Sequence, residues 1–256
     1  MKNRSVNRLS RAAGLTRREP PQPQLRAGQR LYAIGDIHGC LQELRQILNE
    51  VRYDSEDVEG ETHIIFLGDY IDRGPDSKGV IETLRSVARD FPVTCLLGNH
   101  DQTLLDFLET PAVFRDWRCF GAPETLLSYG VQPPRFDDAA AFAQTRDDLV
   151  AALPPEHVIF LKNLKHSVTF GDYFFVHAGV RPGIPLDRQD EQDLLWIREE
   201  FLNSRTDFGR VVVHGHTPSE KPVRKANRIG IDTGAYATGR LTAAVLERSS
   251  CRFIET

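Results

Sequence analysis

Acidic, imidazole and carboxamide side chains recur in this chain within short segments that also carry glycine. The segments are Gly35-Asp36-Ile37-His38-Gly39, Gly68-Asp69-Tyr70-Ile71-Asp72-Arg73-Gly74, Gly98-Asn99-His100-Asp101, His177-Ala178-Gly179 and His214-Gly215-His216. Such groups bind divalent cations and transfer protons. Glycine permits the sharp turns and close backbone approach that a crowded site requires. These segments are therefore candidates for one reaction centre.

Each segment follows a stretch of apolar residues that predicts a β-strand. The predicted strands are 31–34, 64–67, 93–97, 173–176 and 211–213. Apolar residues at helical spacing follow the first three strands, so the sequence predicts three βα units and parallel strands. In open α/β sheets, loops at the carboxyl ends of strands project side chains into one crevice. Residues far apart in the sequence can therefore converge there.

The alternative for each polar residue is a structural role. An aspartate at a strand end is often a helix N-cap or turn former, and we interpret Asp101 in that way. His63, His157 and His166 are likewise interpreted as structural. Three carboxylates in one cleft would cost several kcal/mol per buried charge or become protonated, unless a cation lies between them. The clustered segments therefore favour a metal centre.

Six candidate ligands are too many for one tetrahedral ion. Two ions about 3.5 to 4 Å apart that share one carboxylate would use them all, and such a pair stabilises the attacking and leaving oxygens of phosphoryl transfer. Asp69 lies between the two halves of the ligand set and is the natural bridge. Mixed oxygen and nitrogen ligands suit Mn²⁺, Fe²⁺ or Zn²⁺, and the four cysteines form no C-x-x-C pair.

The five ordered segments resemble the motif set of the phosphoprotein phosphatase (PPP) family of metallophosphoesterases, most closely its bacterial and phage serine/threonine phosphatases. The resemblance covers roughly residues 31–247. It implies an α/β fold (α+β in some schemes) in which a β-sandwich is flanked by helices in αββα order. It also implies a dinuclear site, usually filled by manganese in bacterial members.

Residue roles follow from this resemblance, motif by motif. The implied metal ligands are Asp36 and His38 for the first ion, Asp69 as the bridge, and Asn99, His177 and His216 for the second. His100 and Asp72 match the catalytic dyad of the family. Arg73, Arg198 and Asn99 match groups that bind the substrate phosphate. His214 is left open between a metal contact and a substrate contact.

The expected activity is hydrolysis of a phosphomonoester by in-line attack of a hydroxide that bridges the ions, with His100 as general acid. A serine/threonine protein phosphatase is the favoured interpretation, and the substrate is a phosphorylated protein or a small phosphoester. A symmetrical bis(5'-nucleosyl)-tetraphosphatase, or another nucleotide or polyphosphate hydrolase, is the alternative. Those tetraphosphatases commonly read Ala-Arg-Gly where this chain has Asp72-Arg73-Gly74. A catalytically silent metal-binding protein is a more distant alternative.

The composition of the chain further limits which kinds of protein it can be. The chain has 256 residues, of which 40% are hydrophobic, so one packed domain is expected. Its longest apolar runs are far shorter than the roughly 20 residues that span a bilayer. Residues 1–30 carry a net charge of +7 and the remaining residues −11, which argues against general nucleic-acid binding. Unpaired cysteines favour a reducing compartment, and we expect a cytoplasmic protein.

The chain divides into a basic extension and a catalytic region. Residues 1–28 are arginine-rich and proline-containing and are expected to be disordered, and residues 29–256 form the catalytic domain. Prolines divide 110–162 into short helical patterns, which predicts a helical insertion over the sheet edge. Substrate choice is expected to lie in this insertion and in loop 179–192. The sequence carries no signal for the oligomeric state.

Overall fold

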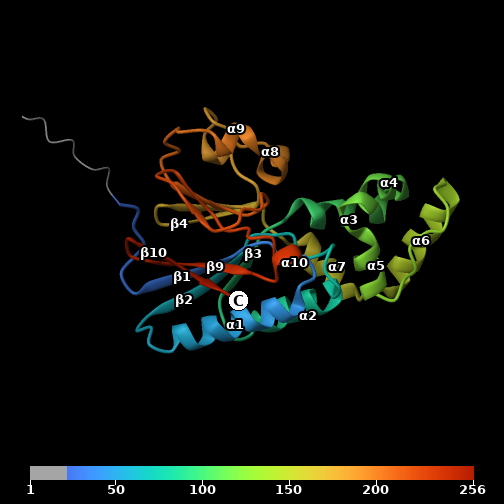
Figure 1. Cartoon of the computed structure of the whole chain (residues 1–256), viewed down its shortest axis with the longest axis horizontal. Helices are drawn as coiled ribbons and strands as arrows, with labels where there is room; N and C mark the ends of the chain where they lie inside the picture. The colour runs from blue at the N-terminus through green and yellow to red at the C-terminus, as the bar shows by residue number, and fades with distance from the viewer. Residues whose placement is uncertain (1–21) are drawn as a thin grey trace, which may run out of the picture.

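The computed structural model describes residues 22–256, which form two five-stranded sheets. The first sheet has the order β10-β9-β1-β2-β3, and its strands are β1 (Gln29–Ile34), β2 (Glu61–Phe66), β3 (Val93–Cys95), β9 (Thr242–Glu247) and β10 (Ser250–Glu255). The second has the order β4-β5-β6-β8-β7, and its strands are β4 (Ser167–Phe170), β5 (Tyr173–Val176), β6 (Val211–His214), β7 (Val223–Arg224) and β8 (Arg228–Gly230). Figure 1 shows the two sheets stacked as layers.

Helices cover the outer face of each sheet. In Figure 1, α1 (Leu41–Ser55) and α2 (Ser77–Val87) lie below the first sheet, and α8 (Glu191–Trp196) and α9 (Glu199–Leu202) lie above the second. The layers therefore follow the predicted αββα order, and the fold prediction is confirmed.

The apolar pattern of the strands explains this layering. On β1, Leu31 and Ala33 belong to the core between the sheets, whereas Tyr32 and Ile34 belong to the core under the helices. Both faces of β1 are buried from Leu31 onward, which is why residues 31–34 form a continuous apolar run. On α1, the buried residues recur at helical spacing and face the sheet.

The strand directions bring the motif segments to one edge. β1, β2 and β3 run parallel, with Ile34 opposite Phe66 and Phe66 opposite Cys95. In the second sheet β5, β6 and β8 also run parallel. The loops after β1, β2, β5 and β6 therefore meet where the two sheets face each other, so the site draws on both sheets and not on a single one.

The structure differs from the sequence prediction at three elements. Strands β7 and β10 were not predicted, although Cys251 and Phe253 alternate with polar residues along β10 and pack against the core. The sequence also predicts one helix around 193–203. The structure divides this segment into α8 and α9, because Arg198 leaves helical geometry with φ −129° and ψ −101°.

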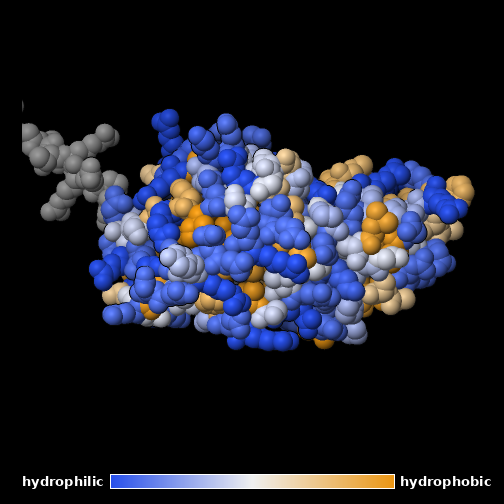
Figure 2. Space-filling model, turned by 60° about the horizontal axis from the view of Figure 1, so that its bottom comes forward, coloured by the Kyte–Doolittle hydropathy of each residue, from blue (hydrophilic) through white to orange (hydrophobic). Residues whose placement is uncertain are grey.

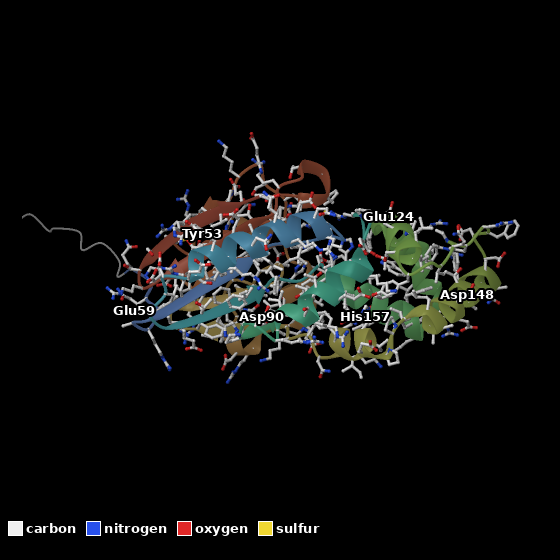
Figure 3. The ribbon with its side chains drawn as sticks, turned by 90° about the horizontal axis from the view of Figure 1, so that it is seen from below. Tyr53, Glu59, Asp90, Glu124, Asp148 and His157 are labelled. Carbon is white, nitrogen blue, oxygen red and sulfur yellow. The ribbon has the colours of Figure 1, made fainter. Side chains whose placement is uncertain are left out.

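The predicted insertion is helical. Its elements are α4 (Phe114–Trp117), α5 (Ala122–Ser128), α6 (Ala139–Ala152) and α7 (Pro155–Lys162), with 3-10 turns at Pro111–Val113 and Arg118–Phe120. With α3 (Asn99–Glu109) they occupy one end of the molecule in Figure 1, and Figure 3 places Asp148 at the far end of this group. Trp117 and Tyr129 are buried, so these aromatic side chains serve the core of the insertion.

The chain before Gln29 lies partly within the described part. Residues 1–21 of the predicted basic extension lie outside the described residues. Leu25, however, is buried in the core between the sheets, and its N–H donates to the Arg248 carbonyl. The packed part of the chain therefore includes residues that precede 29.

Polar residues dominate the exposed surface on the side of α1 and α2. In the view of Figure 2, hydrophilic residues cover most of the molecule and the apolar patches are small and separate. Within residues 22–256, no helix combines the length and the apolar character needed to cross a membrane.

Candidate active site

Four of the six predicted metal ligands, together with the predicted acid His100, form two overlapping groups of possible ligand atoms. His38, Asp69 and His100 form one set of ligand atoms that all lie within 4.8 Å of one another, and Asp69, His177 and His216 form a second set. All these side chains are buried, as are Asp36 and Asn99. Asp69 belongs to both groups, which is the arrangement a bridging carboxylate requires.

His38 is oriented with one ring nitrogen free. Its Nδ1 lies 2.9 Å from the carbonyl oxygen of Ile71, which can only accept, so Nδ1 carries the proton. The Nε2 lone pair then faces Asp69, whose Oδ2 lies 3.6 Å away. Histidines that bind metals usually donate their other ring N–H to a carbonyl or carboxylate in this way.

His177 and His216 face the Asn99 carboxamide from two sides. His177 Nδ1 lies 2.9 Å from the Leu67 carbonyl oxygen, so its Nε2 presents a lone pair. That Nε2 lies 2.8 Å from Asn99 Oδ1, and His216 Nδ1 lies 2.9 Å from the same oxygen. His177 Nε2 and Asn99 Oδ1 therefore face each other as two lone pairs without an intervening hydrogen, and His216 Nε2 is buried without a hydrogen-bond partner among the described residues. A cation resolves that conflict, so the donor set fits a divalent metal.

The carboxylates lead to the same conclusion. Burial raises the pKa of Asp36, and the nearby Asp232 and Asp69 carboxylates raise it further. Burial also raises the pKa of Asp69, but the surrounding imidazoles, His177 first, lower it more, so its net pKa is well below the ordinary value. Several buried carboxylates side by side are costly without a counter-charge.

The backbone of the site is held in unusual conformations. His38, Asp69, Asp72, Arg73 and His216 all have positive φ angles, between 47° and 72°. Such conformations are uncommon outside glycine and cluster at functional sites, where the surrounding structure must hold them.

Asp101 supplies part of that support. Its Oδ2 accepts the N–H groups of Asp69, at 2.8 Å, and of Gly98, at 3.1 Å, and its Oδ1 accepts the N–H of Tyr70 at 3.1 Å. Asp101 therefore has a structural role, as expected from the sequence. It ties the loop after β2 to the start of α3, beyond the local turn that the sequence indicated.

His100 and Asp72 form a buried pair. His100 Nδ1 lies 2.7 Å from Asp72 Oδ2. Burial lowers the pKa of His100, but the Asp69 and Asp72 carboxylates raise it by more, so its net pKa lies above the ordinary value. Its Nε2 is 3.4 Å from Arg73 Nη2 and 3.8 Å from Asp69 Oδ2, and so points toward the ligand cluster. A protonated imidazole in this position can act as an acid.

The two arginines differ in their surroundings. The Arg73 guanidinium lies over the Tyr236 ring, 4.5 Å from its centroid. Arg198 is exposed, and its Nη1 is 3.4 Å from Thr217 Oγ1. Its charge contributes to lowering the pKa of both His177 and His216, which places it near the second ligand group.

His214 has partners of its own. Its Nδ1 lies 3.0 Å from the Gly215 carbonyl oxygen, and its Nε2 lies 3.2 Å from Arg228 Nη1. Burial lowers its pKa to about 3, so it is neutral. Both ring nitrogens are used in these contacts. The sequence left open whether His214 contacts a metal or the substrate; in the structure its ring nitrogens contact protein groups instead.

Two residues near the site were missed by the sequence interpretation. Asp232 is buried, its Oδ1 accepts the Gly234 N–H at 2.9 Å, and burial raises its pKa to about 6. Tyr236, on α10 (Ala235–Thr238), contacts both Arg73 and the His38 ring. Asp232 follows the strand β8 and lies two residues before Gly234, which is a weaker form of the strand-end signal that identified Asp36 and Asp69, where the glycine comes directly before the aspartate.

The fold and the site define a phosphoric ester hydrolase. Residues 29–247 match the Calcineurin-like phosphoesterase (Metallophos) family, and the chain belongs to this family. Members use divalent metal ions, and the ligand groups described above fit them.

Individual relatives carry two kinds of name. The chain is 30% identical to serine/threonine-protein phosphatase 1 of Salmonella typhimurium, over 85% of this chain and 92% of the relative. It is 32% identical to a symmetrical bis(5'-nucleosyl)-tetraphosphatase of Cellvibrio japonicus, over 83% of this chain and 68% of the relative. A crystal structure of a putative diadenosine tetraphosphatase shares the fold, with a TM-score of 0.62 and 23% identity over 88% of this chain and 93% of that one.

Proposed function

We propose that this protein is a phosphomonoesterase that uses two divalent ions, and that it acts on phosphoserine or phosphothreonine in proteins. The observation that carries this proposal is the buried His100–Asp72 pair, whose 2.7 Å contact orients an imidazole beside the ligand cluster. The alkoxide that leaves from a phosphoserine is strongly basic, so proton donation to it accelerates the reaction about 10²- to 10⁴-fold. An anhydride leaving group needs no such acid.

The ligand roles follow the two groups. We assign Asp36, His38 and Asp69 to one ion, and Asp69, Asn99, His177 and His216 to the other. Manganese is the proposed metal, and iron or zinc would suit the same mixed donors. When bound, such ions lower the pKa of water and polarise the phosphoryl group.

The remaining residues act on the substrate. Arg73 and Arg198 would hold non-bridging phosphate oxygens through planar two-point hydrogen bonds, assisted by Asn99. His100 Nε2 would donate a proton to the leaving oxygen, and Asp72 would keep the imidazole charged and oriented. The unpaired cysteines support a reducing compartment, so we place the protein in the cytoplasm.

A specific observation supports one second candidate. The relatives include bis(5'-nucleosyl)-tetraphosphatases of similar identity, so hydrolysis of a dinucleoside tetraphosphate is the competing activity. The two candidates differ in whether Asp72 and His100 are needed.

The test compares two substrates on one preparation. The kcat/KM for a phosphoserine peptide and for diadenosine tetraphosphate is measured with manganese, for the natural protein and for Asp72→Ala. The proposal expects the peptide to be preferred and its hydrolysis to fall at least 100-fold in the variant. Preference for the tetraphosphate, with little effect of the substitution, would establish the second candidate instead.

A further inference from the structure

A large cavity lies at the end of the second sheet opposite the candidate active site. It has a volume of about 1310 Å³ and is lined by Tyr173 and Val211, the first residues of β5 and β6, and by Ile229 of β8. His177, by contrast, follows the last residue of β5, four residues further along the strand. At about 3.3 Å per residue, this separates the cavity from the ligand cluster by roughly 13 Å.

Four cationic side chains line this cavity: Arg205, Arg210, Arg224 and Lys225. Among the described residues, none of the four has a carboxylate oxygen within 4 Å. Arg205 and Arg210 lie in the loop after α9, whereas Arg224 is the last residue of β7 and Lys225 directly follows it. This concentration of cations stands out because residues 31–256 carry a net charge of −11.

Two carboxylates also line the cavity, but both are engaged by backbone groups. Asp172 Oδ2 accepts the Gln24 N–H at 2.9 Å, and Asp207 Oδ1 accepts the Gly209 N–H at 2.8 Å. Arg210 and Lys225 donate to the carbonyl oxygens of Gly171 and Leu202, respectively. The wall therefore keeps a net positive charge, and concave walls focus such a potential.

The Tyr173 hydroxyl gives an independent sign of a missing partner. The Tyr173 side chain is fully buried, yet its hydroxyl oxygen has no hydrogen-bond partner among the described residues. Burial raises the pKa of Tyr173 to about 12, while the charge of Arg224 acts in the opposite direction. A buried hydroxyl without a partner is costly and is rare in folded proteins.

We propose that this cavity binds a small organic polyphosphate, such as a nucleoside triphosphate, at a site separate from the catalytic centre. The four cations suit a phosphate chain, and the Tyr173 hydroxyl adds an uncharged donor without a partner among the described residues. The cavity exceeds what one phosphate would fill, which leaves room for the nucleoside part of such a ligand.

The test uses binding and not activity. Isothermal titration with a non-hydrolysable ATP analogue is carried out on the full chain and on the double variant Arg224→Ala/Lys225→Ala. The matched control, Arg45→Ala/Arg89→Ala, removes two exposed cations from α1 and from the turn after α2. Because both variants keep the catalytic residues, binding lost only in the first is binding in the cavity. We expect at least a tenfold rise in Kd for the cavity variant and less than a twofold change for the control.

A third variant tests the hydroxyl. Tyr173→Phe removes one oxygen and keeps the ring, so we expect weaker binding of the analogue together with an unchanged or higher Tm of the free protein. Tripolyphosphate and adenosine as separate probes distinguish recognition of the phosphate chain from recognition of the base. The proposal would be overturned if the natural protein did not bind the analogue, or if the two double variants lost binding equally. It would also be overturned if Tyr173→Phe bound the analogue tightly and had a lowered Tm.

Discussion

His100 Nδ1 lies 2.7 Å from Asp72 Oδ2, and the same carboxylate oxygen accepts the Trp117 indole N–H at 2.8 Å. The other oxygen of Asp72 accepts the Thr125 hydroxyl at 2.6 Å. The carboxylate that orients the proposed acid is thus held by two residues of the helical insertion. The insertion therefore supports the chemistry and does more than cover the sheet edge.

Replacing His100 with asparagine tests the proposed acid. We expect His100→Asn to retain its metal but to lose about 10²- to 10⁴-fold in kcat on an alkyl phosphate. The loss on p-nitrophenyl phosphate should be smaller, because nitrophenolate leaves without a proton. Steady-state kinetics on both substrates measures the difference, and equal losses would contradict the assignment.

Trp117→Phe tests the link between the insertion and the pair. The change removes one donor from a buried carboxylate, and we expect a loss of about 1–3 kcal/mol in the free energy of unfolding, together with a lower kcat. Phe114→Leu serves as the control, because Phe114 packs against Trp117 but makes no hydrogen bond to Asp72. A control that lowers kcat as much as Trp117→Phe would show that packing, and not the indole N–H, matters.

Manganese should stabilise the fold through the buried ligands. A ligand that binds only the folded state stabilises it by RT ln(1 + [L]/Kd), so we expect Tm to rise with added Mn²⁺ and to fall with a chelator. Asp69→Asn should lose most of this rise and bind fewer than two ions per chain by elemental analysis. Asp116→Asn, at an exposed position, should respond like the natural protein.

Tyr236 is expected to position Arg73. The guanidinium lies over the ring, and such a contact contributes about 0.5 to 2 kcal/mol, which corresponds to about a 2- to 30-fold change. Tyr236→Ala should therefore raise KM for a phosphomonoester by that factor. Tyr236→Phe keeps the ring and should have nearly normal kinetics. A Phe variant as impaired as the Ala variant would point to the hydroxyl instead.

Asp54 should make stability depend on pH in the acid range. Its Oδ2 lies 2.5 Å from Tyr32 Oη, and its carboxylate also pairs with Arg252 and Arg30. Burial raises the pKa of Asp54, but these partners lower it by more, so the folded pKa lies below the ordinary value. The stabilisation is therefore present above the unfolded pKa of about 3.9 and is lost as the pH falls through the folded pKa.

The corresponding measurement is urea unfolding at pH 7 and near pH 3. Asp54→Asn should be less stable than the natural protein at pH 7, and the difference should shrink at the lower pH. Asp57→Asn, an exposed neighbour, controls for the loss of one charge. A difference that does not change with pH would assign the effect to packing.

The sequence by itself determined which residue types stand at the strand ends and most of the segments that form strands or helices, but it missed β7, β10 and the break at Arg198. Asp36, Asp69 and His177 were identified because each follows an apolar strand and lies within two residues of a glycine, and this pattern is local. The alternating and helical spacing of apolar residues likewise identified β1, β2, α1 and α2, since a periodic pattern reports which face of an element is buried.

Only the tertiary structure decided which of these side chains meet and what else joins them. The Trp117 donor to Asp72, the Tyr236 ring under Arg73 and the contact of His214 with Arg228 each join different elements. The cavity beside Tyr173 likewise combines loops that no motif connects. These partners depend on how two sheets and an insertion pack, because side-chain contacts between distant segments leave no periodic trace in the chain.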